Sequence, residues 1–125
     1  MPARSPHWPT SPPELVDHFG RVLERFPELE QRKMYGYPAA FVPAGHMATG
    51  LHESSWIVRL SEEEATELRQ LGGDDFEPMP GRPMKGFVSL PGHILADDDA
   101  LGAWVDRSRR HAGSLPPKKP RKRRA

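Results

Sequence analysis

Residues 31–60, QRKMYGYPAAFVPAGHMATGLHESSWIVRL, decide the fold because their apolar side chains recur with a period of two. Turn residues divide the segment into four short strands, expected at 32–36, 39–42, 46–52 and 55–60. In the last strand Trp56 and Val58 share one face, whereas Arg59 lies on the other. Connections this short force antiparallel pairing, so the segment predicts a β-meander.

An amphipathic helix is predicted just before the meander. Its apolar residues fall on one stripe, namely Leu15, Phe19, Val22, Leu23 and Phe26. Ser11 is placed to cap this helix, and Glu14 three residues later completes a capping box. Pro27 is expected to end the helix, because proline has no N–H to donate.

Two more helices and one more strand are predicted after the meander. Ser61 and Glu64 form a second capping box, and the helix that they begin ends at Gly72. Residues 87–90 predict a fifth strand, and residues 97–113 a third helix. The order α-β-β-β-β-α-β-α therefore predicts a two-layer α+β fold, with three helices on one face of an antiparallel sheet of about five strands.

The connector FEPMPGRPMKG at residues 76–86 combines three prolines with charged and methionine side chains. Proline excludes both a helix and a central strand here, so the segment is expected to be an ordered loop. Pro80 suits the second position of a type II turn, which predicts a positive φ for Gly81.

The 125-residue chain is long enough for one domain, expected at residues 11–115. A proline-rich, disordered arm is predicted at 1–10 and a disordered basic tail at 116–125. The absence of cysteine excludes disulfides, a thiolate nucleophile and Cys-ligated zinc. There is neither an apolar run of the roughly 20 residues that span a bilayer nor a signal-peptide core, so we expect a cytoplasmic protein without membrane contact.

Charge is distributed unevenly along the chain. Six of the 18 basic residues form the tail, whereas the rest carries 12 basic and 17 acidic residues, a net charge of −5. The basic tail residues are Lys118, Lys119, Arg121, Lys122, Arg123 and Arg124. Without interleaved aromatic residues, the tail predicts weak, salt-sensitive and sequence-independent nucleic-acid contact; a solubilising role is the alternative.

Several motifs together resemble the N-terminal domain of the TfoX/Sxy family. They are RKMYGYPAAF at 32–41, GLH at 50–52, VRL at 58–60, the connector and LPPK at 115–118, and the resemblance covers residues 13–118. It implies a small two-layer α+β domain, found in regulators of natural competence that assist a CRP-type activator at promoters. The helical C-terminal domain of full-length members has no counterpart here, so we expect a stand-alone version, to which the fold carries over better than the regulatory role.

Catalytic signatures are missing from the sequence. His46 and His52 lie six residues apart on one predicted strand, roughly 20 Å and too far for one ion. There is no G-x-S-x-G motif, and Gly72-Gly73 lacks the Lys-Ser/Thr of a phosphate loop. We therefore expect no enzyme, metal or cofactor.

Basic residues on the strands and the connector form a candidate anion site, namely Arg32, Arg59, Arg82 and Lys85. Arginine binds carboxylates and phosphates with a bidentate fork. The alternative is that Arg59 faces the helices and forms a buried ion pair with a carboxylate such as Glu77.

A candidate protein contact surface comprises Tyr37, Met79, Arg82, Met84 and Lys85, whereas Met34 and Phe41 are expected in the core. The leading hypothesis is a non-enzymatic interaction or regulatory module whose partner is a protein, such as a transcription factor. The alternative is a domain that binds a small anion. An open pocket lined by Arg59 and Arg82 would favour the ligand, and an exposed patch around Tyr37, Met79 and Met84 the protein.

Overall fold

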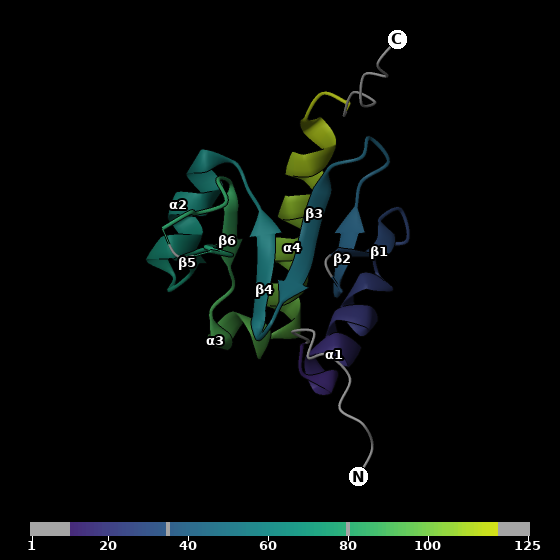
Figure 1. Ribbon diagram of the computed structural model, residues 1–125, viewed down its shortest axis with the longest axis horizontal. Coiled ribbons are helices and arrows are strands. Elements are labelled where there is room, and N and C mark those ends of the chain that lie inside the picture. The colour runs from purple at the N-terminus through teal and green to yellow at the C-terminus, as the bar shows by residue number, and fades with distance from the viewer. Residues whose placement is uncertain (1–10, 35, 80, 118–125) are drawn as a thin grey trace.

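The computed structural model describes residues 11–34, 36–79 and 81–117, and the predicted arm and the basic residues of the tail lie outside these ranges. The elements are α1 (Pro13–Leu23), β1 (Glu30–Met34), β2 (Tyr37–Phe41), β3 (Met47–His52), β4 (Ser55–Arg59), α2 (Glu62–Gln70), β5 (Asp74–Asp75), β6 (Phe87–Ser89), α3 (Gly92–Leu95) and α4 (Asp98–Ser114). The strands form one antiparallel sheet in the order β1-β2-β3-β4-β6-β5 (Figure 1). The predicted α+β fold is confirmed.

The meander has the predicted antiparallel pairing, with one irregularity. Ala40 pairs with Thr49 but Phe41 pairs with Met47, so Ala48 is an extra residue in β3. Regular alternation would turn Ala48 away from the side of Thr49; with this β-bulge Ala48 packs on the helix side, where Thr49 contacts Trp56, and Met47 packs on the opposite face.

The helices cover one face of the sheet, as predicted. α4 packs on β3 and β4, and Figure 1 shows it behind these strands. The larger core lies between these layers and includes Phe19, Trp56, Val58 and Leu101, each with at most 1% of its surface exposed. Burying such side chains stabilises the fold by about 1.5–3 kcal/mol each.

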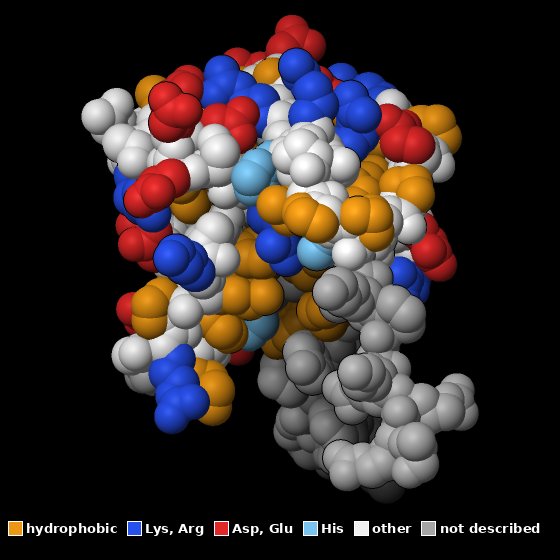
Figure 2. Space-filling model, turned by 90° about the horizontal axis from the view of Figure 1, so that it is seen from above, with side chains coloured by type: hydrophobic (Ala, Val, Ile, Leu, Met, Phe, Trp, Pro, Cys, Tyr) orange, Lys and Arg blue, Asp and Glu red, His pale blue; other side chains and the backbone are white. Residues whose placement is uncertain are grey.

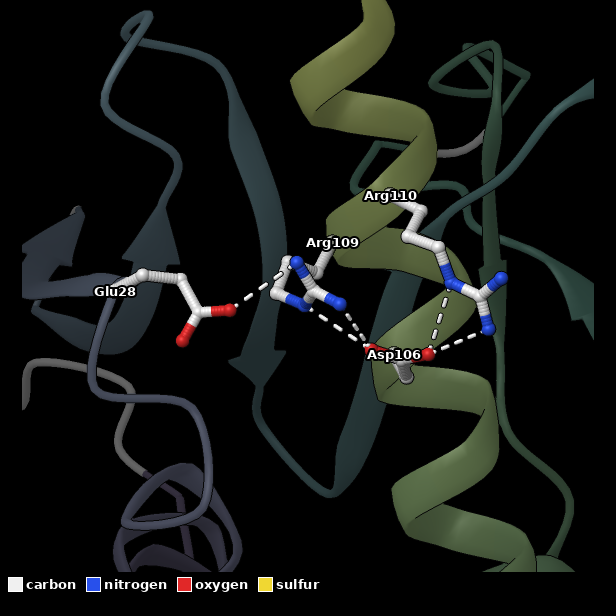
Figure 3. Close-up of polar contacts among 4 residues, drawn as sticks. All are labelled: Glu28, Asp106, Arg109 and Arg110. Atoms are coloured by element: carbon white, nitrogen blue, oxygen red, sulfur yellow. Dashed lines mark hydrogen bonds and ion pairs between the residues drawn. The ribbon is translucent and has the colours of Figure 1, made fainter.

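Charged residues tie the C-terminal half of α4 to the loop between α1 and β1 (Figure 3). Arg109 lies 3.1 Å from Glu28 and 2.5 Å from Asp106, which also accepts from Arg110 at 2.6 Å. The hydrogen bond from Arg109, assisted by Arg110, lowers the pKa of the Asp106 carboxyl. One carboxylate thus orients two arginines along the helix.

Of the two predicted capping boxes, only the second is confirmed. The Ser61 hydroxyl accepts from the Glu64 N–H at 3.2 Å, and the Glu64 carboxylate accepts from the Ser61 N–H at 3.3 Å. The box at Ser11 was wrong: Pro12 occupies the N-cap, which puts Glu14 one position too early to return the bond. The first helix also ends at Leu23, before Phe26 and Pro27.

Other boundaries differ from the prediction by small shifts. Tyr37 and Pro38 were expected in a turn but begin β2, and the turn falls instead at Gly36, where φ is 86°. β5 and α3 were not predicted, because two and four residues are too few to show a periodicity. No helix in the described part of the chain is both long and apolar enough to cross a membrane.

The connector has the predicted turn at Gly81. Its φ is 76°, and the Arg82 N–H donates to the Met79 carbonyl at 2.9 Å across the turn. The Met84 N–H donates to the Phe76 carbonyl at 2.8 Å, which closes the two ends of the connector on each other.

Gly81→Val is expected to lower the free energy of unfolding by about 1–2 kcal/mol, because a β-branched residue is strained at positive φ. Gly20→Ala is the matched control: an added Cβ there meets nothing within 4 Å, and alanine in a helix stabilises by about 0.5–1 kcal/mol. Urea denaturation of both variants checks the signs. A Gly81→Val variant that unfolds like the wild type would contradict the strained turn.

Candidate functional site

The sheet face opposite the helices, which we call the outer face, has an apolar cluster of its own. Its buried members are Ala39, Phe41, Met47, Ile57, Phe76 and Phe87, with Met34 and Met84 packed against them. Phe76 and Met84 belong to the connector, so this segment folds over the face of the strands that lies opposite the described helices. The connector therefore builds part of the outer face.

A groove of about 170 Å³ lies in the outer face, and we call it the methionine groove. Its walls include Met34, Met47 and Met84 together with Tyr37, His52, Ile57 and Phe76. Ala39, a small residue in its lining, pairs with Gly50 across β2 and β3. A Cβ added at Gly50 would lie only 2.8 Å from the Met47 methyl carbon.

Figure 2 shows hydrophobic side chains gathered around a hollow, with basic and histidine side chains at its edge. At one wall of the groove three rings are in contact. The His52 ring lies 4.9 Å from Tyr37 and 5.0 Å from Phe76 between ring centroids. Burial, with a smaller contribution from the charge of Glu53, raises the pKa of the Tyr37 hydroxyl.

The expected exposure of Tyr37 was wrong, since only 6% of its surface is accessible. Met79 is 59% exposed, as a contact residue would be, and Met84 is half-buried in the groove wall. Phe41 is in the core as predicted, and Met34 packs against it. The predicted exposed patch is thus a recessed apolar groove with one exposed methionine beside it.

Arg59 is half-buried on the outer face, next to the groove. Its Nε–H donates to the Met47 carbonyl at 2.7 Å, and its guanidinium carbon lies 4.6 Å from the centre of the Phe87 ring. Burial lowers the pKa of Arg59. Trp56 and Val58 face the helices, so of the two alternatives for Arg59, the position on the helix side was wrong.

The expected ion pair between Arg59 and Glu77 is not formed. Among the ion pairs of residues 11–34, 36–79 and 81–117, none involves either residue. A backbone carbonyl and an aromatic face stabilise this cation in place of a carboxylate. Within the described residues, its charge is thus not paired with a carboxylate.

The proposed anion cluster is only partly assembled. Arg32 shares the outer face with Arg59, but it lies over Phe41 at 4.2 Å and 3.5 Å from Glu30. Arg82 and Lys85 are exposed on the connector. Neither Arg59 nor Arg82 is among the residues that line the methionine groove.

Ser108 of α4 positions the backbone of Arg59 from the other side of the sheet. The fully buried Ser108 hydroxyl accepts from the Arg59 N–H at 3.2 Å and donates to the carbonyl of Ala48 in the bulge. The sequence predicts neither contact, because both join residues far apart in the chain.

A second, wider hollow of about 700 Å³ lies between α2 and α4. Its charged residues are of both signs, and Arg107 pairs with Glu67 at 3.0 Å. The described residues hold no group of three potential metal ligands. His46 donates to the Pro116 carbonyl at 2.6 Å and His52 belongs to the ring contacts, so these histidines take part in packing.

Sequence reasoning missed His52, Met47 and Phe76 as groove residues. Alternation could have placed His52 beside Gly50 on the outer face, but the bulge hides Met47 and the long connector hides Phe76. The residues of the basic tail lie outside the described part of the chain.

Comparison with known proteins identifies one family. A family model described as the TfoX N-terminal domain matches residues 21–112, from α1 to near the end of α4. The match includes every residue of the methionine groove and Arg59. Neither the curated proteins nor the solved structures include a match.

Proposed function

Because the chain belongs to the TfoX N-terminal domain family, we propose that it is a non-enzymatic interaction module with the methionine groove as its contact surface. The groove receives a bulky apolar side chain of a protein partner, and exposed Met79 extends the contact. The observation that carries this proposal is the combination of the groove's size with its apolar walls.

The size of the groove favours a single side chain over a metabolite. Pockets for drug-sized ligands measure about 300–1,000 Å³, whereas an apolar cavity of about 150 Å³ holds one benzene ring. The methionine groove, at about 170 Å³, belongs to the second class. Methionine walls suit such a contact, since their flexible thioethers adapt to the shape of the guest.

The small-anion alternative has less support. A site for a free anion needs several donors directed at one point, yet no arginine lines the groove. Arg32 is engaged with Glu30 and Phe41, and Arg82 and Lys85 are exposed. The basic residues fit better as the charged surroundings of an apolar contact.

The family suggests a regulatory role by analogy. We propose that the partner is a transcription regulator in the cytoplasm, by analogy with the competence role of the best-known members. The six basic tail residues then hold the complex near nucleic acid without reading its sequence.

Selection of a random heptapeptide library on the full chain tests the groove. We expect enrichment of peptides with a bulky apolar residue, and a loss of binding of at least about tenfold on Met84→Glu, which puts a charge into the apolar wall. Leu71→Glu is the control: Leu71 is 44% exposed and lies at the end of α2, outside the groove, so its variant should retain most of the affinity. Peptides that bind both variants alike would contradict the proposal.

The tail has a separate test. Binding of labelled duplex DNA by the full chain should fall by roughly two to three powers of ten between 50 and 200 mM salt if about five phosphates are neutralised. A chain ending at Pro117 should lose this binding, as measured by fluorescence anisotropy. If the DNA affinity is unchanged by the truncation or by salt, the tail is not the nucleic-acid contact.

A further inference from the structure

The environment of Arg59 indicates a chemical property of the partner that the shape of the groove does not. Its guanidinium is half-buried against Phe87, and its Nε–H is occupied by the Met47 carbonyl. Among the described residues no carboxylate pairs with it. A partly desolvated cation gains more from an incoming carboxylate than a fully hydrated one does.

Met47 joins Arg59 to the groove. Its carbonyl holds the guanidinium, while its side chain is one of the groove walls. Ile57, another wall residue, is two positions before Arg59 on the same face of β4. Two residues of a strand span roughly 7 Å, which is the spacing along β4 between this wall residue and Arg59.

An extended peptide repeats the same spacing. Its side chains at positions i and i+2 lie on one side, also roughly 7 Å apart. We propose that the partner presents an extended segment in which a bulky apolar residue fills the methionine groove and an Asp or Glu two positions away pairs with Arg59. This inference rests on the proposed function and adds to it the chemistry of the partner.

A second arginine, Arg32, lies elsewhere on the outer face and bears on the charge of the partner segment. Arg32 lies on the same face of the sheet, and its nearest carboxylate, Glu30, is 67% exposed and 3.5 Å from it. A second acidic residue in the segment could therefore contact Arg32 in place of Glu30. At Arg59 an incoming carboxylate displaces no described carboxylate, so in this proposal Arg59 selects the acidic residue of the partner.

Binding of synthetic heptapeptides to the unmodified full chain tests the groove contact and the pairing with Arg59 separately. The reference peptide carries the central sequence Phe-Ser-Glu between Ser-Gly flanks, and three controls change Glu to Gln, Phe to Ala, or move Glu next to Phe. We expect the Gln peptide to bind about tenfold or more weakly, and the displaced Glu to gain little over Gln. The Ala peptide should not bind measurably.

Variants of the protein complete the test. Arg59→Lys should weaken binding of the Glu peptide about tenfold and leave the Gln peptide unchanged, because lysine lacks the bidentate fork. Arg82→Lys, on the exposed connector, is the matched control and should change neither. Thermal melting checks that the Arg59→Lys variant is folded. The comparison of the Glu and Gln peptides uses only the wild-type protein, so it tests the inference even if this variant does not fold.

The outcomes separate the inference from the proposed function. Glu and Gln peptides that bind equally, with Ala abolishing both, would overturn the role of Arg59 and leave the groove intact. If the peptides with Phe and with Ala bind with equal affinity, the methionine groove is not the contact surface, and the inference about Arg59 is wrong as well.

Discussion

Trp56→Ala is expected to lower the free energy of unfolding by about 3–5 kcal/mol, the largest effect of any substitution considered for this domain. Trp56 is completely buried on the helix side of β4, with its ring centroid 5.0 Å from Phe19 and 5.5 Å from His18. Its indole N–H donates to the Thr49 hydroxyl at 2.8 Å, and that hydroxyl donates to the Ile57 carbonyl. The substitution removes both the volume and a buried hydrogen bond.

Urea denaturation followed by far-UV circular dichroism measures this loss. Trp56→Phe separates the two causes, because it keeps most of the ring volume and removes the N–H donor. We expect this variant to lose less stability than Trp56→Ala. An alanine variant that loses under about 1 kcal/mol would mean that α1 does not pack on β4 as described.

Ser108→Ala is expected to lower the free energy of unfolding by about 1–3 kcal/mol, because it leaves two buried backbone groups without a partner. These groups are the Arg59 N–H and the carbonyl of Ala48 in the bulge, which the Ser108 hydroxyl joins across the sheet. The substitution removes a single oxygen, so the lost volume contributes little. The same change should also loosen Arg59 on the outer face.

Ser114→Ala is the matched control, since Ser114 is exposed near the end of the same helix and bonds only to the carbonyl of His111 among the described residues. It should change the stability by less than about 0.5 kcal/mol. Equal stabilities of the two variants, measured by urea denaturation, would show that the buried hydroxyl does not support the bulge.

The meander was predictable because its signal is local. Alternating residues and short turns in 31–60 lie next to one another in the sequence, so the pairing of four strands follows from them. The Ser61 capping box is equally local and was confirmed. The Ser11 box failed over a single position, because Pro12 rather than Ser11 occupies the N-cap.

The site was less predictable because it depends on contacts between distant segments. The sequence shows that Arg59 and Trp56 lie on opposite faces, but only the packing of α4 decides which face the helices cover. Tyr37 lies buried beside His52, a strand residue far along the chain, and His52 in turn contacts the connector residue Phe76. The bulge at Ala48, which decides where Met47 points, leaves no mark in the alternation.

The position of α4 has a consequence for the synthesis of the chain. The sheet is built from residues 30–89, yet the helix that covers its inner face extends to Ser114 and contributes Leu101, Val105 and Ala112 to the core. A nascent chain that has released the strands but not α4 presents that apolar face to water and to other chains. We therefore expect stable folding on the ribosome to await α4, and a pause in translation within α4 to prolong the aggregation-prone stage.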